Sequence, residues 1–537
     1  MLRLLTHVLV MLLAMASFMQ PFHSIPWPSA LNEGAALVLG LFVSSVTLLR
    51  NISAKIEVTK FELVLLLLLI VHGTILSTSE FQRSMLPVML IAGIVFCCLK
   101  MPAPNNGIIH SLFASIFVAG VASCLLGIGL WLGIFQEYEN YQVWMSHANP
   151  GSPLSGNLSQ PNQVGTLILW AIVVSLYYFE LINKSESTKD VKWALGGGVV
   201  FAILLMAIGI ALTQSRTALL NMGLLTLIVL IFRAHFNFRT RALISIALLV
   251  VVVISAGLPY LKSAILGIDN TAVMGGKTFA DRPRLIAYSV FLNAIWSEWA
   301  LGYGIGGVVF ANIANMLPGN PLNMYFGHAH NIFIDIFVWF GMPLGLFVSA
   351  FIIGRLWRLV MQVKTTEEMA ILGMFSVVLV HALLEYPLHY AYFLVPCAIC
   401  YRFCKVPSSS SGYLISTRWI FTCWILSLIV FYVVAKNYLE VEQDIRQAKL
   451  QMAIMGAPVS APPDYENKIV ELKHLNVAMR ADVKKPLSPH ERAAYDYIVG
   501  VYPTKSFLNN YIDLLVQDGD LAGAQLWTFR RDSLYTK

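Results

Sequence analysis

Long apolar runs recur along the chain between short polar connections, and this pattern constrains the fold more than any other feature. Runs of about 17 to 25 residues match a hydrocarbon layer of about 30 Å at the helical rise of about 1.5 Å per residue. Lipid offers backbone N–H and C=O groups no partner, so such runs must be helical. Only 12% of the 537 residues are charged, against about a quarter in soluble domains. The chain is therefore predicted to be an all-α polytopic membrane protein.

About 13 transmembrane helices are expected, because thirteen runs have this length and polarity. The first run follows Arg3 and has the length of a signal peptide ending at Ala14-Met15-Ala16, but we favour an uncleaved anchor. The spans lie near residues 4–20, 30–49, 61–79, 84–99, 108–135, 163–182, 193–213, 217–232, 241–261, 329–354, 369–384, 389–404 and 418–436.

Lysine and arginine concentrate in alternate connections, as the positive-inside rule expects. Of the 36 basic residues, seventeen lie on one side of the predicted spans, six lie on the other, and thirteen lie from Lys436 onward. The N-terminus is therefore predicted to be cytoplasmic, and an odd number of spans places the C-terminal tail on the exported side. The net charge of +7 follows from this topology, so nucleic acid is excluded as a partner. All seven cysteines fall in apolar spans, so we expect no disulfide framework in the outer loops.

The pattern divides the chain into a transmembrane domain, 1–436, and a soluble helical region, 437–537. Two long exported loops, 136–162 and 262–328, interrupt the transmembrane domain. Residues 504–531 in the tail predict a helix, a turn and a second helix, and no second copy recurs at a fixed period.

The second exported loop contains a predicted interfacial helix at 284–299, which carries Trp296 and Trp299 near its end. Tryptophan is enriched at headgroup depth, so this helix is expected to lie on or in the membrane interface. The glycine-rich segment 302–307 follows it. No strand precedes these glycines, so they predict a tight, closely packed turn and not a dinucleotide site.

Charged and titratable residues gather at the exported ends of the spans. Arg216 lies in a very short turn between two apolar helices, while Arg282 and Arg284 begin the interfacial helix. His330 lies at the start of the tenth span, and Glu385 lies between the eleventh and twelfth. Each has an ordinary alternative interpretation, because arginines anchor helices at headgroups and a histidine at a helix end commonly makes a structural hydrogen bond.

Taken together, these side chains combine fixed positive charge with a base that titrates near neutral pH. Asp335 lies about one turn inside the tenth span, at a place from which it can orient an imidazole. Arginine binds phosphate oxygens through charge-assisted hydrogen bonds. The arrangement therefore favours a site for an anionic, lipid-linked substrate.

Ligand types alone also allow a metal site built from His328, His330, Glu385 and His389. The His-x-His spacing is not diagnostic, and no cysteine or paired carboxylate joins the group. We therefore expect no metal and no other cofactor.

An ordered set of short motifs on this one face resembles the bacterial O-antigen ligase and polymerase superfamily, and within it the PglL/PilO-like protein O-oligosaccharyltransferases. The tail resembles the extra C-terminal region of that protein-glycosylating branch. The motifs are Gly156–Asn162, Ser215–Thr217, Arg284–Leu285 with the later Gly302–Gly304, His330–Asn331 and Glu385–Leu388.

The resemblance implies transfer of a preassembled oligosaccharide from undecaprenyl pyrophosphate to a serine or threonine hydroxyl of an exported protein, such as a pilin, without a metal. It implies a bacterial inner-membrane protein acting at the periplasmic face. His330 would be the general base, and Arg216, Arg284 and Arg282 would bind the pyrophosphate. The chain departs from the family at Tyr288, and the Asp281-Arg282 pair leaves open which of Arg282 and Arg284 binds phosphate. Supporting roles would fall to Asn331, Asp335, Glu385, Asn157, Gln160 and Asn162.

Two related activities and one unrelated class remain as alternatives. An O-antigen ligase would transfer the glycan to lipid A core, and a polymerase would transfer it to another lipid-linked glycan. The long exported tail favours a protein acceptor by analogy. A transporter or flippase would need buried coupling charges near mid-membrane, and the spans offer few.

Overall fold

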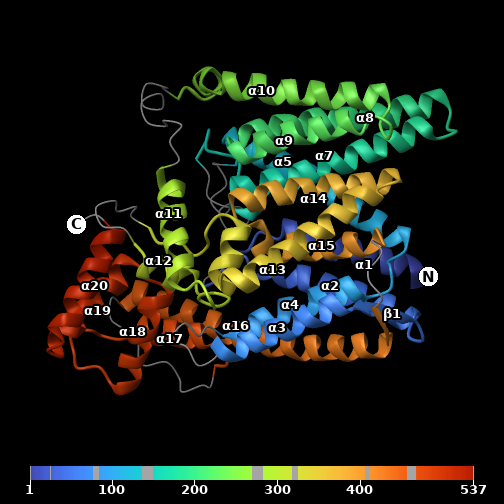
Figure 1. Ribbon diagram of the computed structural model, residues 1–537. Coiled ribbons are helices and arrows are strands. Elements are labelled where there is room, and N and C mark those ends of the chain that lie inside the picture. Colours follow the sequence, from blue (N-terminus) through green and yellow to red (C-terminus); the bar gives the residue numbers. More distant parts are fainter. Residues whose placement is uncertain are drawn as a thin grey trace.

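The structure is a computed structural model that describes residues 2–23, 26–76, 84–135, 149–268, 282–316, 324–405, 412–455 and 467–535. Most of these residues are helical, and long helices lie side by side in one bundle (Figure 1). The N-terminus lies at one end of the bundle and the C-terminus at the other (Figure 1). The chain is a multi-pass α-helical membrane protein.

Each of the thirteen expected spans corresponds to one helix. Among the described residues, eight helices are long and apolar enough to cross a membrane, and four more are apolar but shorter. The number of crossings remains a prediction. The thirteen helices are α1 (Leu2–Met19), α2 (Ala30–Arg50), α3 (Lys60–Leu76), α4 (Met85–Lys100), α5 (Asn106–Trp131), α7 (Pro161–Lys184), α8 (Lys189–Leu212), α9 (Arg216–Ile231), α10 (Phe238–Leu266), α13 (Ile332–Gln362), α14 (Thr366–Leu384), α15 (Ala391–Phe403) and α16 (Thr417–Met455).

Helix α7 forms the centre of the bundle. Its most apolar window is 83% buried, whereas the corresponding windows of α10 and α16 are only 28% and 17% buried. Large side chains such as Trp170 and Tyr177 on α7 are almost fully enclosed. The outer helices expose leucine and valine because lipid, and not protein, is their neighbour.

A small two-stranded sheet was not predicted from the sequence. Strand β1 (Lys55–Thr59) pairs antiparallel with β2 (Gly412–Ser416), and it connects the α2–α3 loop to the start of α16. The sheet lies at the end of the bundle that carries the N-terminus (Figure 1). The alternation in β1, with Ile56 and Val58 buried, is the period-two signal of a strand, but five residues are too few to stand out among helices.

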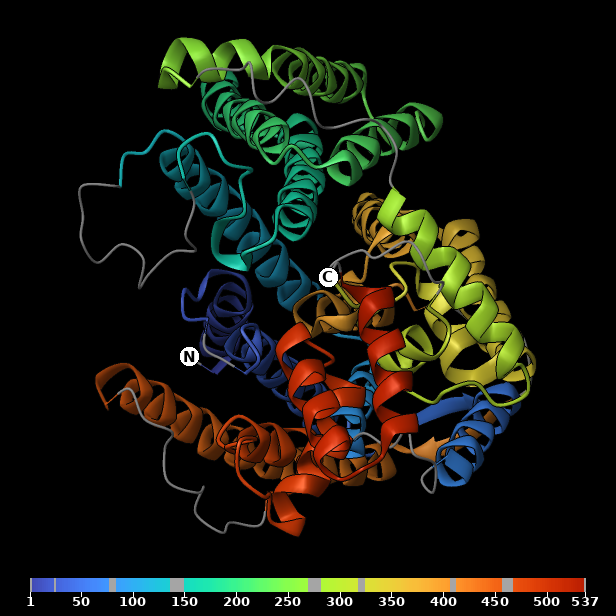
Figure 2. The same ribbon diagram turned by 90° about the vertical axis from the view of Figure 1, so that its left-hand side faces the viewer.

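The opposite end of the bundle carries the helices of the 262–328 loop and the tail (Figures 1 and 2). The predicted interfacial helix is present as α11, and Figure 1 shows it running across the bundle end. Its inward face buries Val290 and Phe291, whereas Leu285, Leu292 and Trp296 are more than half exposed. An exposed apolar face on such a helix suits headgroup and acyl contact. These outer helices are α11 (Arg282–Ser297), α12 (Val308–Ala314), α17 (Val470–Ala478), α18 (Pro489–Val501), α19 (Lys505–Gln517) and α20 (Leu521–Leu534).

The predicted helix–turn–helix of the tail is confirmed as α19 and α20, which turn at Gly519 with φ of 78°. Helices α17 and α18 pack together just before it, so the tail contains two successive hairpins. The earlier hairpin escaped the sequence analysis because α17 has only nine residues. Helix α16 continues through position 436 without a break, so the proposed boundary falls inside a helix.

The tail shares its hydrophobic core with the 262–328 loop. Val290 of α11 and Val309 and Ile313 of α12 belong to the same buried cluster as Ile498 and Leu508 of the tail. The glycine at 500 lies directly against the ring of Phe310. The tail therefore supports the loop that carries Arg282 and Arg284.

The glycine-rich segment forms the close backbone contact that its sequence predicted. Helix α13 is interrupted at Gly341, where φ is 68° and ψ is 179°. Segment 299–304 packs into this interruption through three backbone hydrogen bonds of 2.7 to 3.0 Å. A Cβ on Gly302 would lie 2.5 Å from the nitrogen of Gly341, so the two glycines permit this approach.

Replacing Gly341 with alanine should destabilise the protein by at least about 2 kcal/mol, because its φ/ψ region is almost exclusive to glycine. The added Cβ would also lie 2.7 Å from the carbonyl carbon of Ala300. Thermal unfolding in detergent measures the loss. Gly354→Ala on the same helix is the control, because a Cβ there meets nothing within 4 Å. Equal melting temperatures for the two variants would contradict this account.

Candidate functional site

The carboxylate of Glu385 contacts three of the predicted site residues at the end of the bundle opposite the N-terminus. Glu385 follows the last residue of α14 and is only 5% exposed. Its Oε2 atom lies 2.8 Å from Nδ1 of His330. Its Oε1 atom forms an ion pair with Arg284 of α11 and accepts a 3.2 Å hydrogen bond from Asn162 of α7. Residues far apart in the sequence therefore meet at one carboxylate.

The partners of Glu385 keep its carboxylate ionised. Burial alone would raise its pKa, but the hydrogen bond and charge of His330 and the charge of Arg284 outweigh burial and lower the pKa below the usual value. An ionised carboxylate only accepts hydrogen bonds, so Nδ1 of His330 is assigned as the donor. In the neutral ring, Nε2 then carries the lone pair and can accept a proton.

The backbone around His330 is held on both sides. His330 has a φ of 56°, a left-handed conformation that costs free energy in a non-glycine residue. On one side, the N–H of Ala329 donates to Asp335 at 2.8 Å. On the other, Asn331 caps α13 by accepting from the N–H of Phe333 and donates to the carbonyl of Leu383 at 3.0 Å. These bonds fix the histidine relative to α13 and α14.

Asn162 connects this cluster to the start of α9, where Arg216 lies. Ser215 donates to Oδ1 of Asn162 at 2.6 Å and caps α9 by accepting from the N–H of Ala218. Arg216 is the next residue, and its side chain is exposed. The structure therefore places Arg216 at the same end of the bundle as Arg284 and His330.

Of the remaining predicted residues, Gln160 reaches the cluster through Tyr386, whose ring centroid lies 5.2 Å from that of His330. Asn157 is buried and donates to the carbonyl of Met19, which attaches the η1 turn (Gly156–Leu158) to α1. Gln160 hydrogen-bonds Gln163 and the hydroxyl of Tyr386. The backbone of Arg282 begins α11, but its side chain lies outside the described part of the chain.

Asp335 does orient an imidazole, but that imidazole belongs to His389. Oδ2 of Asp335 lies 3.1 Å from Nε2 of His389, and the rings of His389 and His328 are 3.9 Å apart. The four residues weighed from sequence as a metal set are therefore divided. His330 and Glu385 belong to the arginine cluster, whereas His328 and His389 lie with Asp335. Sequence spacing gave no sign of this division.

Two further polar residues lie beneath the site. His381 precedes Glu385 by one helical turn and bonds Thr166 of α7 at 2.7 Å, and both side chains are buried. The four-residue spacing to Glu385 is the signal that could have placed His381 on the same face. Its contact with α7 reinforces the junction that supports Asn162.

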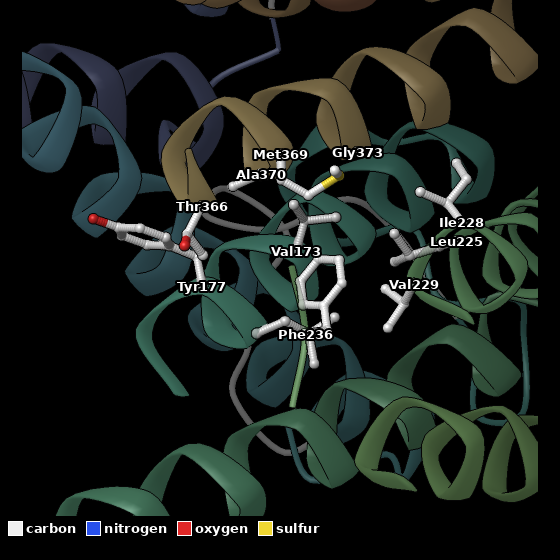
Figure 3. A pocket seen from close by; sticks show the side chains of 11 residues that line it. Val173, Tyr177, Leu225, Ile228, Val229, Phe236, Thr366, Met369, Ala370 and Gly373 are labelled. Atoms are coloured by element: carbon white, nitrogen blue, oxygen red, sulfur yellow. The ribbon is translucent and has the colours of Figure 1, made fainter. Parts of the chain in front are cut away.

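A small pocket lies elsewhere, between α7, α9 and α14 (Figure 3). It is near the start of α14, whereas Glu385 follows the end of that helix. Apolar side chains dominate it and no charged group lines it, so the catalytic candidates are not there. Its lining residues are Val173, Leu176, Tyr177, Leu225, Ile228, Val229, Phe236, Thr366, Met369, Ala370 and Gly373.

Comparison with known proteins matches two families to separate parts of the chain. The O-antigen ligase family matches residues 201–349, which include Arg216, Arg284 and His330. A family described as virulence factor membrane-bound polymerase, C-terminal, matches residues 369–537, which include Glu385 and the tail.

Two curated relatives from Acinetobacter baylyi are similar to the chain. A general O-oligosaccharyltransferase is 24% identical over 547 residues, covering 97% of this chain and 90% of the relative. A ComP-specific O-oligosaccharyltransferase is 26% identical over 330 residues, covering 59% of this chain and 57% of the relative.

Replacing Asn331 with alanine should lower stability by at least about 1 kcal/mol, because it removes a helix cap. Asn331→Asp is the matched variant, since its carboxylate can still accept from the N–H of Phe333 but cannot donate to Leu383. Thermal unfolding in detergent should give the order wild type, Asn331→Asp, Asn331→Ala, from most to least stable. If Asn331→Ala is as stable as wild type, the Asn331 cap does not contribute to stability.

Proposed function

We infer that the chain, which belongs to the O-antigen ligase superfamily, is a membrane-bound O-oligosaccharyltransferase that transfers a glycan to a protein hydroxyl. The single observation that carries the chemical assignment is the cluster in which Glu385 contacts both His330 and Arg284. It joins a candidate base to a fixed positive charge at the outer end of the bundle.

In the proposed reaction, a serine or threonine oxygen of the acceptor attacks the anomeric carbon of the glycan. The bond from that carbon to the phosphate oxygen breaks, and the pyrophosphate leaves with the bonding electrons. Nε2 of His330 accepts the hydroxyl proton as the new bond forms. A hydroxyl is a weak nucleophile until a base accepts its proton, and an imidazole suits that role near neutral pH.

Glu385 would act as a positioning residue for this base. Its hydrogen bond to Nδ1 directs Nε2 toward the acceptor, and its negative charge stabilises the imidazolium formed by proton transfer. Arg284 and Asn162 hold the carboxylate in place from the opposite side. The geometry supports a base whose orientation is set before substrate arrives.

The arginines would stabilise the leaving pyrophosphate. A guanidinium has five N–H donors, so Arg284 can hold Glu385 and a phosphate oxygen at once. Arg216 adds an exposed positive charge at the same end of the bundle. Charge on the leaving group grows during bond cleavage, so fixed cations lower the barrier. We include Arg282 with them as a candidate on the sequence resemblance alone.

We propose undecaprenyl pyrophosphate as the lipid carrier and a pilin or another exported protein as the acceptor. A polyisoprenoid chain stays in lipid while its pyrophosphate must reach water, so the transfer site belongs at a membrane interface. The exposed apolar face of α11 beside Arg284 suits that location. The positive-inside pattern supports a periplasmic location for the site and the tail. We further propose that the membrane is a bacterial inner membrane and that residues 1–436 perform transfer.

The ligase and polymerase alternatives would use the same chemistry on a different hydroxyl. The names of the two curated relatives favour a protein acceptor over lipid A core or a growing glycan. The same similarities favour a transferase over a transporter.

Replacing His330 with alanine should lower glycan transfer by about 10²- to 10⁴-fold, the usual contribution of a general base. The intact mass of a co-expressed acceptor protein measures transfer, because each glycan adds a fixed mass. His490→Ala, in an exposed position of the tail, is the control and should glycosylate normally. Full transfer by a well-expressed His330→Ala protein would exclude the catalytic assignment.

Replacing Arg216 or Arg284 with alanine should weaken binding of the lipid-linked donor by about tenfold or more, since hydrogen bonds to charged groups contribute about 1.5 to 3 kcal/mol. Retention of a radiolabelled donor by protein in nanodiscs measures this. Arg233→Ala, beyond the opposite end of α9, is the matched control. Unchanged donor affinity in both Arg216→Ala and Arg284→Ala would rule out the pyrophosphate role.

A further inference from the structure

We propose that His328, Asp335 and His389 form a binding site for one divalent transition-metal ion, most suited to Zn²⁺, separate from the residues that perform transfer. Each residue offers one ligand atom, and the three atoms lie within 4.8 Å of one another. They come from the loop before α13, the first turn of α13 and the η3 turn (Pro387–His389). The inference does not depend on the proposed glycan transfer.

The donor set matches what zinc prefers. Two imidazole nitrogens and one carboxylate oxygen are common zinc ligands, and three protein ligands leave a fourth position for water. Calcium and magnesium bind oxygen ligands, so two imidazoles select against them. The single carboxylate offsets half of the metal charge, so the occupied site would keep one net positive charge.

The surroundings hold the ligands as a metal site requires. Asp335 is 1% exposed, and its other oxygen accepts the N–H of Ala329 at 2.8 Å, so its orientation is fixed. Trp339 contacts the ring of His389, and Tyr386 contacts the ring of His328, at centroid distances of 5.4 and 4.5 Å. Partners that orient the ligands in this way tune metal affinity.

The alternative occupant of the site is a proton. His389 and Asp335 are 3.1 Å apart, a distance that a hydrogen bond between them also explains. A divalent ion would use both imidazoles, whereas a proton uses only one.

A metal here would fix the loop that carries the candidate base. Residues 328 and 330 lie on either side of Ala329, whose N–H is already bound to Asp335. The ion would therefore tie this loop to α13 and to η3 without contacting Nε2 of His330. Its role is structural, which is compatible with a transfer reaction that uses no metal.

Elemental analysis of the full chain, purified in detergent after growth with Zn²⁺ and extensive dialysis, tests the proposal. We expect about one zinc per chain in the wild type. His330→Ala is the matched control, because it removes a histidine from the same loop without touching the site, and it should retain the metal. His389→Ala and Asp335→Asn should each lose most of it.

Thermal unfolding of the wild type makes the result independent of whether the variants fold. EDTA should lower the melting temperature, and added Zn²⁺ should restore it, because an ion that binds only the folded state stabilises that state. The absence of zinc in the wild type, together with a melting temperature insensitive to EDTA and Zn²⁺, would overturn the proposal. Equal zinc in wild type and His389→Ala would also overturn it.

Discussion

The buried carboxylate of Glu385 is the interaction on which the geometry of the site depends. An ionised group in this position must be compensated, and removing one partner from such a pair costs about 3 to 5 kcal/mol. The compensation comes from Arg284, His330 and Asn162, which belong to three different parts of the chain. The need to neutralise one charge therefore brings α7, α11 and the loop before α13 to the end of α14.

The second constraint is the bilayer, which determines where this charge can lie. Backbone polar groups in lipid are satisfied within helices, so loops with irregular conformations collect at the bundle ends. The left-handed residue His330 and the interruption at Gly341 both lie where neighbouring segments supply hydrogen bonds. At this end, α11 presents apolar side chains outward and Arg284 inward to the carboxylate. A substrate with a lipid tail and a charged headgroup needs both environments at once.

Hydropathy predicted the helices well, because a lipid solvent imposes length and polarity on each span separately. The charge bias of short loops predicts an exported position for Arg216, Arg284, His330 and Glu385, and the structure places all four at one end of the bundle. The pairing among them did not, because Arg284 and Glu385 are 101 residues apart and no local pattern encodes their contact. For the same reason, the sequence predicted an imidazole beside Asp335 but did not identify it as that of His389. It also explains the unforeseen β1–β2 pairing and the core shared by the tail and α12.

The central claim is that Glu385 acts in glycan transfer through His330, and a double-mutant cycle tests it most directly. Transfer rates would be measured with purified protein for His330→Ala, Glu385→Gln and the double variant. Residues that work as one unit give non-additive losses. The account predicts that Glu385→Gln slows the wild type but causes little further loss once His330 is alanine. If the double variant instead loses the full product of the two single effects, Glu385 acts independently of His330 and the account is wrong.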